Sequence, residues 1–127
     1  MTRSKGFTTK IVKASSTVAK GNLLKVHTDG TVLPCAAATD VALYAALEAG
    51  SAGEEIPVAI LGVLDETILV LSGGAVAVGN PVTPEAKAAT ADGALFCGRA
   101  LTAATDAGEM IEVAACVAGT LSVPAAG

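Results

Sequence analysis

Residues with chemical reactivity are few in this sequence. His27 is the single histidine among 127 residues, and we expect it to lie on a strand face. A Ser-His-Asp triad would place it beside a serine in an exposed turn, but the sequence contains no Gly-x-Ser-x-Gly motif. A Cys-His pair with Cys35 is formally possible, although neither the order nor the spacing of the two residues supports it. The sequence therefore predicts no catalytic residue and a protein that is not an enzyme.

The remaining acid-base and metal-binding groups are badly placed for such chemistry. The carboxylate pairs Glu54-Glu55 and Asp65-Glu66 are adjacent in sequence. Adjacent residues on a strand point to opposite faces, so neither pair forms an acid/base couple. No Cys-x-x-Cys pair occurs, and one histidine cannot complete a Cys/His zinc site. We expect no metal, no cofactor and three reduced thiols, which are Cys35, Cys97 and Cys116.

Motifs for phosphate binding and for prosthetic groups are also missing. The glycine-rich segment 72–79 lacks the Gly-x-Gly-x-x-Gly spacing and the following helix that cradle a pyrophosphate. A biotinyl or lipoyl carrier needs a lysine at a tight turn between its two halves, but none lies between Lys25 and Lys87. Nucleotide binding and carrier function are therefore not expected.

Charge is unevenly distributed along the chain. All twelve acidic residues lie at Asp29 or later, and six of the eight basic residues lie before it. These six are Arg3, Lys5, Lys10, Lys13, Lys20 and Lys25. We interpret residues 1–14 as a basic amino-terminal arm that docks on an acidic partner surface, with a solvated tail as the alternative. Nucleic acid is not expected as a partner, because the basic residues are few and no aromatic stacking platform accompanies them.

A targeting or membrane segment is not evident. The basic start lacks the apolar region of a secretory signal. The uncharged stretch 67–84 is long enough to span a bilayer, but glycines interrupt it and its polarity alternates. We predict two strands and a turn there, and we expect no membrane partner.

An internal repeat is the most informative feature of the chain. The matching pairs are Gly21-Asn22 with Gly79-Asn80, Ala46-Leu47 with Ala100-Leu101, and Gly53-Glu54 with Gly108-Glu109. The separation falls from 58 to 54 residues between the first and second pairs, so the second copy has lost a few loop residues. We predict a single β domain over 15–127, with copies at about 15–64 and 73–118. Two such copies suit packing about a pseudo-twofold axis.

Turn dipeptides such as Asp29-Gly30 punctuate the chain at short intervals. Between them lie short runs rich in Val, Ile, Leu and Thr, which are typical of strands. The predicted strands cover 23–26, 56–64, 67–71, 95–101, 110–115 and 121–123, and 56–64 is apolar nearly throughout, as in a central strand. We predict the class all-β, a compact sandwich or barrel of short strands built from two copies of one β-motif, with at most a short helix.

Two segments have helical features. Residues 39–49 are rich in Ala and Leu, with possible caps at both ends. Gly98 lies in the middle of the matching segment of the second copy, so we predict a strand over 41–47 instead. Thr83-Pro84-Glu85 is typical of a helix start, which predicts a short helix around 84–89.

The repeated half-motif resembles a family of small phage proteins, the capsid decoration or cement proteins. It joins a Gly-Asn turn and a hydrophobic pair, as in Lys20-Gly21-Asn22-Leu23, to a later Ala-Leu and an Ala-Gly-Glu. The matching segments are 19–24, 29–30, 46–49 and 52–54, then 78–80, 98–101 and 107–109. The resemblance implies a homotrimer that binds the major capsid protein on the outside of a phage head and stabilises its lattice. It also implies a place on the capsid exterior of the virion after synthesis in the host bacterial cytoplasm.

Composition independently favours self-association. Hydrophobic residues make up 52% of the chain, yet there are only two Phe, one Tyr and no Trp. Small side chains bury little area each, so the core of a single chain is thin and a partner surface would add stability.

The predicted capsid-binding residues lie in the amino-terminal arm. They are Thr2, Arg3, Ser4, Lys5, Gly6, Phe7, Thr8 and Thr9. In extended form, residues 7–14 are suited to adding a strand to a sheet edge of the major capsid protein or of a neighbouring subunit. The alternative function is a small-molecule-binding, β-clip-like module without catalysis of its own. The scarcity of aromatic residues counts against that alternative, because ligand pockets usually rely on them.

Overall fold

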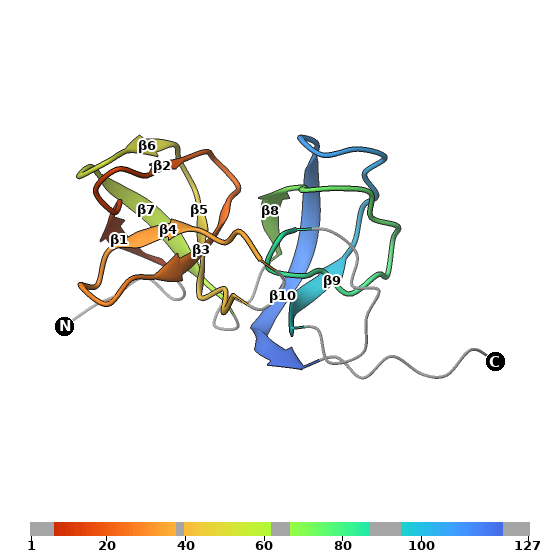
Figure 1. Ribbon diagram of the computed structural model, residues 1–127. Coiled ribbons are helices and arrows are strands. Elements are labelled where there is room, and N and C mark those ends of the chain that lie inside the picture. Colours follow the sequence, from red (N-terminus) through yellow and green to blue (C-terminus); the bar gives the residue numbers. More distant parts are fainter. Residues whose placement is uncertain (1–6, 38–39, 62–66, 87–94, 121–127) are drawn as a thin grey trace.

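The computed structural model describes residues 7–37, 40–61, 67–86 and 95–120 (Figure 1). In these ranges the chain contains strands and turns but no helix. No helix of the described part could therefore cross a membrane. The prediction of an all-β fold of short strands is confirmed.

The first half of the chain forms an antiparallel five-stranded sheet with the order β1-β7-β5-β3-β4. Its strands are β1 (Phe7–Ile11), β3 (Leu23–Val26), β4 (Val32–Pro34), β5 (Tyr44–Ala46) and β7 (Glu55–Ile60). The short strands β2 (Thr17–Val18) and β6 (Gly50–Ser51) pair with each other beside this sheet (Figure 1). Strand β1 is thus an outer strand of the sheet.

The second half forms a smaller antiparallel sheet with the order β8-β10-β9. Its strands are β8 (Ile68–Leu71), β9 (Leu95–Ala100) and β10 (Met110–Thr120). An isolated bridge between Val76 and Ala104 occupies the place that the β2-β6 pair has in the first half. Strand β8 is therefore the counterpart of β1, because each lies at the outside of its sheet against a long strand, β10 or β7.

Most strand predictions agree with the structure. Strands are observed at 23–26, 68–71, 95–100 and from 110 onward. The strand predicted over 56–64 is β7, which lies between β1 and β5 and ends at Ile60, and residues 62–64 of that prediction lie outside the described residues. The prediction of a strand within 41–47 is confirmed by β5, where burial of Ala45 and Ala46 outweighs their helix propensity. The segment predicted as a strand at 121–123 lies outside the described residues.

The helix predicted around 84–89 is not present in its described part. Ala86 has a φ of +62°, which a right-handed helix excludes. Its N–H donates to the Thr83 carbonyl at 2.8 Å, so this segment is a tight turn. Residues 87–89 of the prediction lie outside the described residues.

Hydrogen bonds fix the first Gly-Asn turn, and three of them involve Ala46 or the Asn22 side chain. The Gly21 N–H donates to the Ala46 carbonyl at 2.9 Å, and the Ala46 N–H donates to the Asn22 carbonyl at 2.8 Å. The Asn22 side-chain oxygen accepts from the Ala19 N–H at 2.8 Å. Gly21 has a φ of +89°, a conformation that favours glycine because it lacks a Cβ.

The second Gly-Asn turn has the same three hydrogen bonds. The Gly79 N–H donates to the Ala100 carbonyl at 2.7 Å, and the Ala100 N–H donates to the Asn80 carbonyl at 2.9 Å. The Asn80 side-chain oxygen accepts from the Ala77 N–H at 2.9 Å. Gly79, with a φ of +88°, therefore occupies in the second half the position that Gly21 occupies in the first.

The halves differ most at their first hairpin. The Val32 carbonyl accepts from the Lys13 N–H at 2.8 Å, and the Ala86 carbonyl accepts from the Gly73 N–H at the same distance. Ala86 thus stands where Val32 stands, although the β3-β4 loop at 27–31 has no equivalent before it. The residues missing from the second copy are those of this loop.

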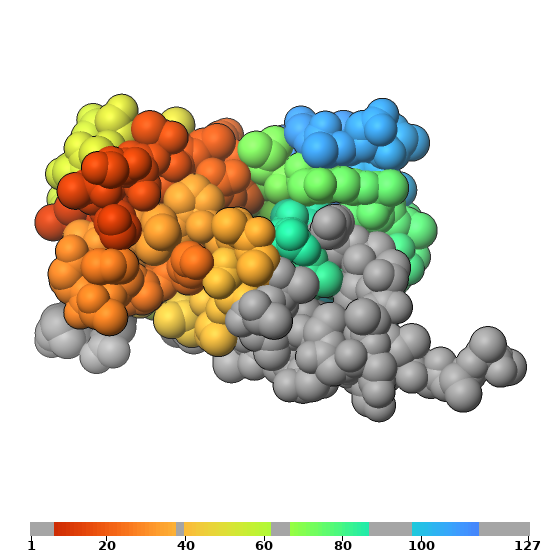
Figure 2. Space-filling model, in the orientation of Figure 1, coloured from red at the N-terminus to blue at the C-terminus, as the bar shows by residue number. Residues whose placement is uncertain are grey.

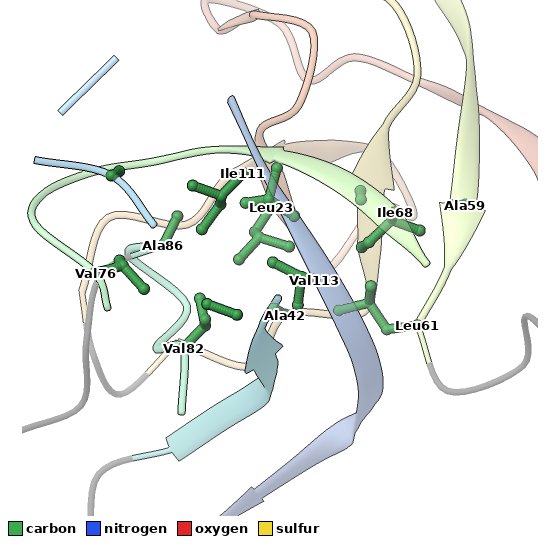
Figure 3. Close-up of a cluster of buried hydrophobic side chains, with 14 residues drawn as sticks. Leu23, Ala42, Ala59, Leu61, Ile68, Val76, Val82, Ala86, Ile111 and Val113 are labelled. Atoms are coloured by element: carbon green, nitrogen blue, oxygen red, sulfur yellow. The ribbon is translucent and has the colours of Figure 1, made fainter. Parts of the chain in front are cut away.

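Buried apolar side chains form two clusters. The first half has its own core, made of Val12, Val18, Leu24, Val32, Ala46, Ile56 and Val58. The larger cluster combines side chains from both halves, including Leu23, Ala59 and Ile68 (Figure 3). Its buried members are Ala, Val, Leu and Ile only. The two halves are therefore joined through a shared aliphatic core.

Candidate interaction surfaces

The predicted capsid-binding segment has only its last three residues in the described part. Thr2 to Gly6 lie outside it, whereas Phe7, Thr8 and Thr9 are exposed residues of β1. Strand β1 pairs with β7 of its own chain over its whole length. Residues 7–11, which belong to the arm expected over 1–14, are therefore paired within the chain's own sheet. Their β-propensity is satisfied within the chain.

The outer side of β1, which we call the β1 edge, has exposed residues at Phe7–Thr9 and at Ile11, and its C-terminal end adjoins β4 through the Val12–Val32 bridge. The Val12 N–H donates to the Glu54 carbonyl at 2.8 Å on the β7 side. Successive N–H groups of an antiparallel strand point to alternate sides, so the Ile11 N–H points outward. Ile11 is 49% exposed, and the Thr9 hydroxyl donates to the Glu55 carboxylate at 3.3 Å.

The basic residues near the amino terminus have different surroundings. The Lys10 ammonium lies 5.4 Å from the centre of the Tyr44 ring. Lys25 forms an ion pair with Asp40 at 3.0 Å. Two backbone N–H groups also donate to Asp40, and its pKa is lowered, first by the hydrogen bond from Ala36. Lys25, one of the six basic residues near the amino terminus, is therefore already paired within the chain.

The two halves meet at an interhalf joint, where the first Gly-Asn turn lies along the outer side of β8. The Leu71 N–H donates to the Gly21 carbonyl at 2.8 Å. A Cβ at Gly21 would lie 2.7 Å from the Leu71 nitrogen and 2.8 Å from the Met110 methyl carbon. The turn and β8 are thus in close contact, and no side chain fits between them.

Aliphatic residues extend this joint into the core. Leu23, Ala45 and Ala59 lie on the outer face of the first sheet and are at most 4% exposed. They belong to one cluster with Ile68 and Val70 of β8 (Figure 3). At the joint, the outer face of the first sheet therefore packs against the inner face of β8.

The corresponding surface of the second half has no partner in the part of the chain that the structure describes. We call it the Gly79 end, and it consists of Val78, Gly79, Arg99 and Leu101. Val78 is 64% and Leu101 is 44% exposed. The Arg99 guanidinium donates to the Gly79 carbonyl at 3.1 Å. The loop that carries Gly79 (green) and β1 (red) lie at opposite sides of the molecule (Figures 1 and 2).

This arrangement corrects the expected pseudo-twofold axis. A twofold relation would bring Gly79 to Ile11 in the same way that it brings Gly21 to Leu71. Among the described residues only the second contact is present, so the halves are packed head to tail.

Reactive groups of the described part do not gather into a site. His27 lies in the β3-β4 loop, not on a strand face as predicted, with its Nδ1 3.1 Å from Asp29. Hydrogen bonds from Thr31 lower the pKa of Asp29 to about 2. Burial raises the pKa of the Cys35 thiol to about 12, which disfavours the nucleophilic thiolate. No group of three or more potential metal ligands occurs among the described residues.

Two hollows on the described surface are small or shallow. One of about 150 Å³ lies at the interhalf joint, between Phe7, Lys20 and Leu69. Another, of about 440 Å³, is wide open and has Asn80 and Thr105 as its polar residues. Pockets for small molecules are usually concave, with volumes of roughly 300–1,000 Å³ and several convergent polar groups. Neither hollow favours the alternative of a ligand-binding module.

Sequence reasoning missed the Gly79 end. Its signal was present in the repeat, because Val78 replaces Lys20 beside the same turn. The exchange places an exposed apolar side chain at this turn, where the first half has a lysine.

Comparisons with known proteins identify a fold. No protein-family model matches the sequence, and no curated protein matches it. Among solved structures, the chain is similar to the head fiber gp8.5 N base of bacteriophage phi29, with a TM-score of 0.66 and 17% sequence identity. The similarity covers 94% of this chain and 99% of that chain. The two chains therefore share a fold over nearly their whole lengths.

Proposed function

We propose that this chain is a structural protein of a phage virion that binds the outside of the head as a homotrimer and stabilises the major capsid lattice. The observation that carries the proposal is the similarity of fold to the phi29 head fiber N base, which covers nearly all of both chains. The protein would be made in the host bacterial cytoplasm and act without catalysis, cofactor or metal.

The character of the described surface supports a binding role. Several apolar side chains are exposed, among them Ile11 on the β1 edge and Val78 and Leu101 in the Gly79 end. The carboxylates of Asp40, Glu54 and Glu109 lie in separate turns, where each accepts hydrogen bonds from backbone N–H groups. Such a surface suits docking between proteins better than chemistry on a small molecule.

We assign attachment to the capsid to the segment Thr2–Thr9. Phe7, Thr8 and Thr9 are paired in β1, so a deletion through residue 9 would damage the sheet as well as the attachment. Removal of residues 2–6 is the better test, because it leaves β1 intact and removes Arg3 and Lys5. A chain that lacks residues 123–127 is the matched control, with the same number of residues removed at the other end.

The test is cosedimentation with purified heads that lack the protein. The full chain and the control should bind heads saturably and raise the temperature at which heads release DNA. The variant without residues 2–6 should keep its far-ultraviolet circular dichroism spectrum but bind more weakly. Failure of the full chain to bind any head of its own phage would contradict the proposed function. Equal binding of all three chains would contradict only the assignment of the attachment residues.

A further inference from the structure

We propose that a second copy of this chain docks its Gly79 end on the β1 edge, repeating between chains the interhalf joint that exists within each chain. The joint provides the template, because each of its two surfaces has a counterpart in the other half. Both counterparts are exposed and lie on opposite sides of the molecule (Figure 1).

The backbone donor of the joint has a counterpart in β1. Leu71 is the last residue of β8, and the next residue, Ser72, donates its N–H to the Glu109 carbonyl at 2.8 Å. Ile11 is the last residue of β1, and Val12 donates its N–H to the Glu54 carbonyl at the same distance. The Ile11 N–H therefore points outward in the way that the Leu71 N–H does.

The backbone acceptor has a counterpart at Gly79. Gly21 and Gly79 have the same φ within a degree and the same turn hydrogen bonds. The Gly79 carbonyl accepts from Arg99, and a carbonyl oxygen has a second lone pair. It can therefore also accept from the Ile11 N–H of a neighbouring chain.

The side chains that flank the acceptor fit this role. Lys20 and Leu47 line the hollow of the interhalf joint against Leu69. Their counterparts are Val78 and Leu101, which are exposed in the single chain. Burial of apolar surface is the main favourable contribution to most protein association. The Gly79 end therefore has a more apolar flank than the turn that already makes the joint.

One pair of opposite charges fits the same pairing. Met110, which lies over Gly21 at the joint, has Glu55 as its counterpart, since each pairs with the last residue of the outer strand, Leu71 or Ile11. Glu55 of one chain would then approach the Gly79 turn of the next. Arg99 lies at that turn, so opposite charges meet and set the register of the contact.

The symmetry of the contact follows from its two different surfaces. In an open row of chains joined head to tail, one terminal chain keeps a free Gly79 end and the other keeps a free β1 edge. Closure of the row into a ring pairs both surfaces of every chain. In a ring of three chains, joints within chains alternate with joints between chains. That the ring has three chains rests on the homotrimer of the proposed function. The contact between the Gly79 end and the β1 edge is inferred from the interhalf joint alone.

The experiment compares Gly79→Ala with Gly108→Ala by sedimentation equilibrium over a range of concentrations. Both glycines have positive φ, at +88° and +94°, and a Cβ at either would meet nothing within 4 Å in the single chain. The two variants should therefore fold with similar stability. Gly108→Ala should associate like the unchanged chain, and Gly79→Ala should associate about tenfold more weakly or worse, because its Cβ would meet the neighbour's strand.

A charge reversal provides the second measurement. Arg99→Glu should weaken association several-fold, and addition of Glu55→Arg should restore it. Assemblies insensitive to Gly79→Ala and Arg99→Glu would overturn this interface and leave the proposed homotrimer and head binding in place. A full chain that stays monomeric at its highest soluble concentration would also overturn it, even if that chain binds heads. A full chain that forms the predicted ring but binds no heads would contradict the proposed function and support the interface.

Discussion

Replacement of Gly21 by alanine tests whether close contact at the interhalf joint stabilises the fold. The control is Gly53→Ala, because Gly53 also has a positive φ, +82°, but a Cβ there would meet nothing within 4 Å. Both variants therefore force alanine into the left-handed region. Only Gly21→Ala places a methyl group 2.7 Å from the backbone nitrogen of Leu71.

The expected magnitudes differ for a physical reason. The left-handed conformation costs about 1–2 kcal/mol at either position. At Gly21 the clash with backbone adds an overpacking cost of about 1–3 kcal/mol, and loss of the Leu71–Gly21 hydrogen bond adds about 1 kcal/mol. The Met110 side chain can move aside, but the Leu71 nitrogen moves only if β8 moves with it. We expect Gly21→Ala to lose about 2–4 kcal/mol more stability than Gly53→Ala.

Urea unfolding followed by far-ultraviolet circular dichroism measures the difference. Both variants are compared at one low protein concentration, because self-association would add stability by mass action. Equal decreases in the free energy of unfolding for the two variants would refute the reasoning, since they would show that the interhalf joint accommodates a methyl group without cost.

Three further predictions concern individual side chains. Ser72→Ala should lower the free energy of unfolding by about 1–3 kcal/mol in thermal denaturation, because the buried hydroxyl donates to the Asp106 carbonyl and accepts from the Glu109 N–H. The pKa of Asp40 is lowered in the folded state, so its contribution to folding stability is present above its unfolded pKa and decreases as pH falls below about 4. Asp40→Asn should therefore flatten this part of the curve of stability against pH, measured by urea unfolding at several pH values. Cys35 should react with iodoacetamide at pH 8 far more slowly in the folded than in the unfolded protein, as peptide mass mapping can follow, since burial raises its pKa to about 12.

The fold class and most strands could be predicted from local patterns. Turn dipeptides and β-branched runs locate strands such as β3 and β8 because these signals are confined to a few neighbouring residues. The repeat also predicted β5 correctly against its helix propensity. The prediction of a helix at 84–89 failed because Ala86 lies in a left-handed turn and its carbonyl accepts from the distant Gly73 N–H, a contact that no local preference shows.

The interaction surfaces were predictable only in part. Residues 7–9 were expected to pair with a sheet edge, but their partner is β7 of the same chain, more than 40 residues away. The head-to-tail packing of the halves could not be predicted, because two similar sequences are compatible with several relative placements. The difference between Lys20 and Val78 was visible in the repeat. Its structural role depends on which of the two Gly-Asn turns packs against the other half of the chain, and the sequence does not show that.

The order in which strands become available during synthesis follows from the pairing of β1 with β7. Translation proceeds at about 5–20 residues per second, and domains generally fold as units from the amino terminus. Strand β1 leaves the ribosome first but has no partner strand until Glu55–Ile60 has followed. Once it has, the five-stranded sheet and its own core are complete. Leu23, Ala45 and Ala59 then stay uncovered until β8 is made, so a nascent first half briefly exposes an apolar face to chaperones or to other nascent chains.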